Sequence, residues 1–236
     1  MFLTDVILHA GDIASLMTFY RDVLGLPILE EKADFLAVRV GQTRLAFKKD
    51  LSGWRGAAHF AIDVPVSQFD QAMEWIAART PLLTDSQGSA VFYNQSWNTR
   101  QLYFQDAAGN FVEFIGHANE PSPGRAFFDE LSFQRIIEIG IPTLNVRKSL
   151  SDLLLVMPGV KVYRNGLDGA TAVGDRNGML VLIDKGRSWF PAMGGQPADF
   201  VPLQVEILQT TGGTFRLKVP PYPFDIDESS ESPYSF

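Results

Sequence analysis

Few side chains in this sequence can carry out chemistry. The chain has three histidines and no cysteine, which excludes disulfides, thiolate metal sites and a cysteine nucleophile. No serine lies in a nucleophile-elbow motif. His9 and His59 fall within predicted strands, whereas His117 follows one and is expected at the surface. Because imidazole titrates near neutral pH, His9 is a candidate general acid or base, although it could equally well only form a hydrogen bond at its strand end.

These residues lie in a pattern that recurs along the chain. Its first copy has a short apolar strand, a helix capped by Asp12 and ended by Gly25, and three further strands. We predict the strands at 3–10, 27–31, 35–40 and 43–48. The pattern returns near His59 and again, in a weaker form, near Glu138. Such repeats predict βαβββ units that pair and close a cavity between them.

The rest of the chain divides around these units. Residues 1–117 are expected to form two paired units, and 118–134, where proline and glycine cluster, a linker. Residues 135–224 are expected to form a degenerate unit and part of a fourth, whose first and last strands are 200–208 and 214–219. The acidic, serine-rich tail 225–236 is predicted to be disordered.

Composition excludes several kinds of partner. The net charge of −7 argues against nucleic acid. No apolar run reaches the length of a membrane span. The first residues have neither the basic region nor the cleavage site of a signal peptide. We therefore expect a cytoplasmic protein that binds a small molecule and exists as a monomer or a homodimer.

Strand alternation groups some polar residues of the first unit. Asp5 and His9 share one face of the first strand, and Arg44 and Lys48 share one face of the last. If Asp5 points into a cavity, His9 does too. Arg44 and Lys48 would then favour an anionic or phenolate-like substrate, unless their charged ends extend to solvent.

Two segments resemble a known superfamily. FYRDVLGL at 19–26 and WNTRQLYFQDAAGNFVEF at 97–114 resemble the vicinal oxygen chelate superfamily. This superfamily includes glyoxalase I, fosfomycin- and bleomycin-resistance proteins and extradiol ring-cleavage dioxygenases. The resemblance is strong over 2–117 and weak over 135–219. It implies an α+β fold in which tandem βαβββ units form incurled mixed β-sheets, with the second half degenerate.

The resemblance also implies a metal site. In that superfamily the ligands come from the first and last strands of each unit, which here gives Asp5, Ala46, His59 and Glu113. Ala46 cannot bind a metal, and Asp5 stands where a histidine is usual. Asp5, His59 and Glu113 would form a site with one histidine and two carboxylates, which favours Fe²⁺, Mn²⁺ or Mg²⁺ over Zn²⁺.

The same alignment gives a different result in the second half of the chain. The matching positions there are Glu138, Val181, Phe200 and Leu217. One carboxylate among three apolar residues cannot hold a metal. We therefore expect Glu138 in a salt bridge or at a rim, and the second half as a structural partner of the first.

Tyr103 adds a hydroxyl to the expected cavity. Pairing across the turn at 106–110 places Tyr103 opposite Glu113 on one sheet face. A tyrosine at the matching position faces the ligand in the fosfomycin-resistance proteins. Tyr103 and His9 are thus the candidate catalytic residues, although Tyr103 could also be a core aromatic whose hydroxyl is hydrogen-bonded.

Three functions are compatible with this sequence. The first is a metal-dependent enzyme, a dioxygenase or a lyase or isomerase, that chelates two neighbouring oxygens of a substrate. The second is a metal-free protein that binds a small aromatic or antibiotic-like molecule, as the departures at Asp5 and Ala46 suggest. The third is an interaction scaffold that uses the proline-rich segment 219–224 and the acidic tail.

Overall fold

The computed structural model describes residues 1–52, 57–118, 125–165, 170–189 and 197–229. The first unit has the predicted βαβββ order. Its elements are β1 (Phe2–Ala10), α1 (Ile13–Met17), β2 (Ile28–Lys32), β3 (Phe35–Val40) and β4 (Thr43–Lys49). Asp12 caps α1 by accepting a hydrogen bond from the Ser15 amide at 3.1 Å. The helix then widens into a π-helix over Thr18–Val23, which the sequence pattern does not predict, and Gly25 at φ +69° ends it.

The second and third units have the same order of elements. The second consists of β5 (His59–Asp63), α2 (Phe69–Ala77), β6 (Phe92–Asn94), β7 (Thr99–Gln105) and β8 (Phe111–His117). The third consists of β9 (Arg135–Thr143), α3 (Val146–Val156), β10 (Val162–Asn165), β11 (Ala170–Asp175) and β12 (Gly178–Asp184). The third unit therefore has its helix and all of its strands. One-turn 3₁₀ helices lie at Val66–Gln68 and Glu130–Ser132.

The C-terminal strands differ from the expected fourth unit. β13 (Leu203–Leu208), β14 (Thr214–Val219) and β15 (Asp225–Glu228) pair in sequence order as an antiparallel meander. In a βαβββ unit the first and last strands are parallel, so β13 and β14 are not the first and last strands of such a unit. Phe200, expected to begin the first of these strands, lies before the start of β13. The predicted disorder is also wrong for 225–228, which form an edge strand, and 230–236 lie outside the described residues.

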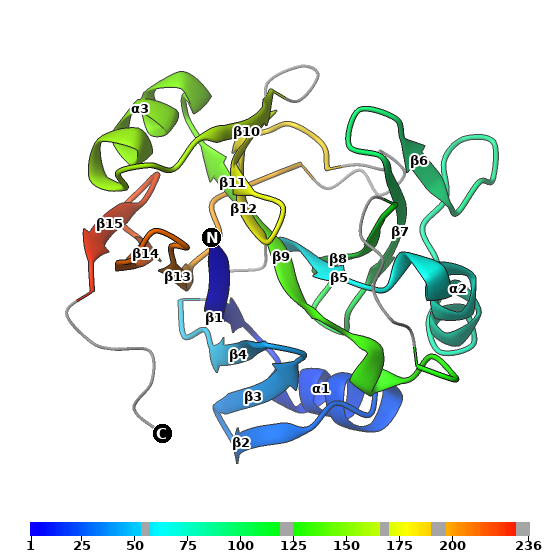
Figure 1. The fold of residues 1–236 in the computed structure, drawn as a ribbon. Helices are drawn as coiled ribbons and strands as arrows, with labels where there is room; N and C mark the ends of the chain where they lie inside the picture. The colour runs from blue at the N-terminus through cyan, green and yellow to red at the C-terminus, as the bar shows by residue number, and fades with distance from the viewer. Residues whose placement is uncertain (53–56, 119–124, 166–169, 190–196, 230–236) are drawn as a thin grey trace.

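The first and second units, which were expected to pair with each other, lie in different sheets. One mixed sheet has the order β15-β14-β13-β1-β4-β3-β2, and the other has the order β10-β11-β12-β9-β5-β8-β7-β6. The second unit thus joins the third through the antiparallel pair β5–β9, while the first unit joins the meander through β1–β13. Figure 1 shows the strongly curled strands, with the three helices at the periphery. The strands of residues 1–117 are therefore divided between two sheets.

The parallel strand pairs repeat one register. The paired positions are Ile7 with Ala46, Ala61 with Glu113, and Gly140 with Val181. Asp5, His59 and Glu138 each lie two residues earlier on the first strand of their unit. The positions aligned from the sequence in these three units are thus structurally equivalent, although the units combine in a different way.

Apolar side chains fill the space between the sheets and under the helices. The buried Phe19 of the first unit contacts Phe104 of the second, which packs against Phe114. Tyr20, the neighbour of Phe19, packs against Phe47. The segment expected to be a linker also packs on this core, since its Phe128 is buried. In the described part of the chain, no helix has the length and apolar character needed to cross a membrane.

Candidate metal centre

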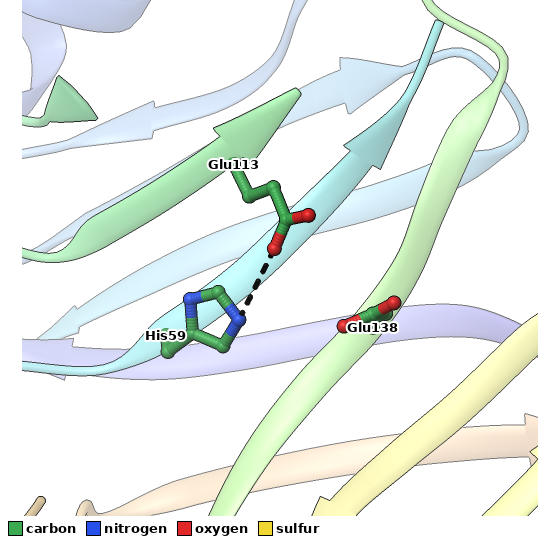
Figure 2. Close-up of side chains that lie close together, drawn as sticks. All are labelled: His59, Glu113 and Glu138. Carbon is green, nitrogen blue, oxygen red and sulfur yellow. Dashed lines mark ion pairs between the residues drawn. The ribbon is translucent and has the colours of Figure 1, made fainter. Parts of the chain in front are cut away.

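Three ionisable side chains converge inside the eight-stranded sheet. His59 comes from β5, Glu113 from β8 and Glu138 from β9, and each is at most 6% exposed. One potential ligand atom from each lies within 4.8 Å of those of the other two. The His59 Nε2 and Glu113 Oε2 atoms are 3.6 Å apart, and Figure 2 shows Glu138 facing this pair from the neighbouring strand. The adjacent strands β8, β5 and β9 therefore present a histidine and two carboxyl groups to one point.

Hydrogen bonding to the main chain sets the tautomer of His59. Its Nδ1 lies 3.2 Å from the carbonyl oxygen of Phe111. A carbonyl only accepts, so Nδ1 carries the hydrogen and donates it. Nε2 is then left with a lone pair directed toward the acidic residues. Burial lowers the pKa of His59 to about 4, against a small opposing effect of the Phe111 bond. The imidazole is therefore neutral at physiological pH, the form in which histidine binds metals.

The two glutamates resist ionisation together. Burial raises the pKa of Glu138 to about 8. Burial, and then the nearby Glu138, raise the pKa of Glu113 well above its ordinary value, although hydrogen bonds from Tyr103 and Gln101 oppose this. Two like charges in a poorly solvated site repel each other, so the pair holds a proton at neutral pH in the absence of a cation.

The donor set fits a divalent cation. Glu113 Oε1 and Glu138 Oε1 are buried and have no hydrogen-bond partner among the residues that the structure describes, which is costly for a carboxyl oxygen. A cation between the carboxylates would satisfy these oxygens and accept the His59 lone pair. One nitrogen and several oxygens are donors that suit Mn²⁺ or Fe²⁺. The fourth equivalent position is Val181, which supplies no donor, so this side of the site is open to the cavity.

The three residues line a cavity of about 670 Å³, a size typical of small-molecule sites. Its lining combines aromatic and aliphatic side chains with several polar ones. Besides the three residues, the lining consists of Asn94, Trp97, Gln101, Tyr103, Ala170, Val181, Ile183, Arg187, Ser188 and Trp189. Trp189 is 6% exposed, and its ring lies 4.9 Å from the His59 ring at 34°. The cavity therefore combines a ligand cluster with flat apolar walls.

The structure separates the residues predicted as metal ligands. Asp5 lies in the seven-stranded sheet, where it accepts hydrogen bonds from Arg44 at 2.9 and 3.0 Å. Burial raises the pKa of Asp5, and Arg44 opposes that effect. Glu138, which was expected in a salt bridge or at a rim, lies beside His59, in the position predicted for Asp5. The expectation that Asp5 joins His59 and Glu113 is thus corrected, because the first unit pairs with the meander.

The other predicted cavity residues also divide between the sheets. Tyr103 lies opposite Glu113 as predicted and lines the cavity. His9 is on β1, with Nδ1 4.0 Å from Asp50 Oδ1, and burial lowers its pKa. Lys48 is exposed beside it on β4. His9, Arg44 and Lys48 therefore lie on the seven-stranded sheet, outside the lining of this cavity.

Sequence reasoning found Glu138 but assigned it to the wrong group. Its signal was a single carboxylate in the otherwise apolar segment 136–141, aligned with His59. Trp189 and Arg187 were not identified as cavity residues, because they follow the last strand of the third unit and have no strand periodicity to place them.

Comparison with known proteins shows the fold. No model of a protein family and no curated protein matches this sequence. Among solved structures, a proposed dioxygenase of Bacillus subtilis superposes with a TM-score of 0.63 at 13% identity, over 98% of this chain and 86% of the other. The chain has the vicinal oxygen chelate fold.

Glyoxalase I of maize, Zea mays, has the same fold. Structures of two single-residue mutants of that enzyme superpose on this chain at 12% identity, with TM-scores of 0.57 and 0.58. The first match covers 97% of this chain and 92% of the maize chain, and the second covers 96% and 93%. The resemblance seen in the sequence is thus confirmed at the level of the fold.

Proposed function

We propose that this protein is a metal-dependent enzyme that binds a divalent ion through His59, Glu113 and Glu138 and chelates two neighbouring oxygens of a small substrate. The observation that supports this most is the convergence of three buried donor groups in a cavity of about 670 Å³. Two of these groups have an oxygen with no hydrogen-bond partner in the described part of the chain. Proteins named as a dioxygenase and as glyoxalase I share the fold.

Each residue of the proposed site has a distinct task. His59 offers Nε2 because its Nδ1 hydrogen is held by the Phe111 carbonyl. Glu113 and Glu138 supply the negative charge that would balance a divalent ion. When bound, the ion would act as a Lewis acid that polarises the two substrate oxygens. The Tyr103 hydroxyl, whose pKa burial raises well above its ordinary value, remains protonated and is placed to donate a hydrogen bond beside Glu113.

The walls indicate what kind of substrate fits. Trp97, Tyr103 and Trp189 offer flat apolar surfaces, and Ala170, Val181 and Ile183 an aliphatic one. Arg187 is the one cationic side chain among the described residues of the lining. A small substrate with an aromatic portion and an anionic group would use both features. This proposal gives no role to His9, Arg44 or Lys48.

A second candidate is a metal-free binding protein. The raised pKa values of Glu113 and Glu138 favour it, because a carboxyl group that stays neutral needs no cation. The apolar Val181 at the fourth position is compatible with it as well. In that case Glu113, Glu138 and Tyr103 would only form hydrogen bonds with a ligand.

The content of the protein purified without chelator separates these candidates. The enzyme proposal predicts bound manganese or iron by elemental analysis, and a rise in Tm when Mn²⁺ is added to chelator-treated protein. Native mass spectrometry that shows an organic ligand and no metal, together with an unchanged Tm in Mn²⁺, would favour the binding protein and refute the enzyme proposal.

A further inference from the structure

A buried hydroxyl from the first unit reaches the second unit close to the candidate metal centre. Tyr20 lies in the π-helix Thr18–Val23 and is 0% exposed. Its hydroxyl donates a hydrogen bond to Asp106 Oδ2 at 2.8 Å. Asp106 begins the turn between β7 and β8, so the bond joins two units that belong to different sheets. A π-helical turn often marks a functional position, because it redirects a side chain out of the α-helical pattern.

The carboxylate of Asp106 organises the turn around it. Oδ1 accepts hydrogen bonds from the Ala108 amide at 2.9 Å and from the Asn110 amide at 3.0 Å. Oδ2 accepts from Tyr20 and, at 2.8 Å, from the side-chain Nδ2 of Asn110. With four donors, this carboxylate is well satisfied although it is buried. The bond to Nδ2 also fixes which way the Asn110 amide points.

The oriented Asn110 holds the residue before His59. Its Oδ1 accepts a hydrogen bond from the Ala58 amide at 2.9 Å, and the Ala58 carbonyl accepts one from the Phe111 amide at 2.8 Å. The carbonyl of Phe111 in turn faces His59 Nδ1 at 3.2 Å. A series of hydrogen bonds, joined through the main chain of Ala58 and Phe111, therefore links the Tyr20 hydroxyl to the ring that would bind the metal.

We propose that Tyr20, through Asp106 and Asn110, is a positioning residue that holds His59 in the Nδ1–H tautomer and aims Nε2 at Glu113 and Glu138. This inference rests on the proposed function, because it concerns the metal affinity of that site. It assigns the N-terminal unit, which supplies no residue to the cavity lining, a role in forming the metal centre. A group that orients a metal ligand typically changes metal affinity by 10–100-fold when removed.

The first test uses the metal-free protein. Tyr20→Phe removes only the hydroxyl, and Tyr93→Phe is the matched control, because Tyr93 is exposed and bonds Asn98 outside the chain of hydrogen bonds. The ¹⁵N resonances of His59 report its tautomer directly. We expect one Nδ1–H form in the wild type and in Tyr93→Phe, and a mixture of tautomers in Tyr20→Phe. If Tyr20→Phe does not fold, Asp106→Asn is the alternative variant, because it removes the carboxylate that accepts the hydrogen bond from Tyr20.

The second test measures Mn²⁺ affinity on the same proteins. We expect the Kd of Tyr20→Phe to rise about tenfold and that of Tyr93→Phe to stay within twofold of the wild type. A Tyr20→Phe protein with a lower Tm but the wild-type tautomer and Kd would overturn the inference, since the hydroxyl would then act only on stability. If the wild type binds no Mn²⁺, the proposed function fails, and the tautomers alone still decide whether Tyr20 orients His59.

Discussion

The ionisation of Glu138 gives a quantitative prediction for the metal-free protein. The pKa of this group rises from 4.5 to about 8 on folding. Between these values the folded state retains a proton that the unfolded state has lost, so the free energy of unfolding must fall as the pH increases. Each pH unit in this interval costs about 1.4 kcal/mol, which gives at most about 5 kcal/mol over the whole interval.

His59 acts in the opposite direction but only at lower pH. Its pKa falls from 6.5 to about 4 on folding, so its contribution to stability is lost as the pH decreases below 6.5. Above 6.5 this contribution is constant, and the glutamates dominate the pH dependence of this cluster. From pH 6.5 to about 8, Glu138 alone is expected to cost about 2 kcal/mol.

Glu138→Gln isolates this effect, because it keeps the shape of the side chain and removes the charge. We expect the variant to lose less stability than the wild type from pH 6.5 to 8, and to be the more stable protein at pH 8, since only Glu113 still resists ionisation. Urea unfolding with a chelator present measures both slopes. Glu74→Gln, at an exposed residue of α2, is the control and should follow the wild type. A Glu138→Gln protein with the wild-type slope would contradict the raised pKa of Glu138.

Two further substitutions test the walls of the cavity. A Cβ on Gly140 would lie 2.4 Å from Cη2 of Trp189, so Gly140→Ala should destabilise the protein by about 1–3 kcal/mol and shift the tryptophan emission. The control Gly11→Ala, whose Cβ would have no neighbour within 4 Å among the described residues, should do neither. Equal unfolding free energies for the two variants would contradict this packing. Val181→Glu places a carboxylate at the position equivalent to Glu113. It should lower the Tm of the metal-free protein but strengthen Mn²⁺ binding, which titration calorimetry measures. Weaker Mn²⁺ binding would contradict the equivalence of the two positions.

The sequence was sufficient to predict the units but not how they combine. Strand periodicity, the Asp12 cap and the Gly25 stop place the elements of the first unit within one or two residues of those observed. The positions of Asp5, His59 and Glu138 are equivalent in register. These are local properties, fixed by side-chain alternation and by turn residues.

The pairing of the units depends on contacts between strands far apart in sequence. The strands β1, β5 and β9 are each largely apolar, and each has an ionisable residue at the equivalent position, so the local pattern does not distinguish β5–β9 pairing from β1–β5 pairing. The choice of partner decides whether Asp5 or Glu138 lies beside His59. Arg44 indicates that Asp5 is not a metal ligand, because the register places Arg44 opposite Asp5 and its charge neutralises the carboxylate. The prediction of the cavity was wrong in the pairing of the units, so the residues assigned to it lie in two different sheets.

The most direct test of the metal centre is a titration of chelator-treated protein with Mn²⁺, followed by electron paramagnetic resonance. We expect saturable binding of one Mn²⁺ per chain in the wild type and in Asp5→Asn, and its loss in Glu113→Gln and Glu138→Gln. Wild-type protein that binds no Mn²⁺, or binding that depends on Asp5 and not on Glu138, would contradict the proposed metal centre.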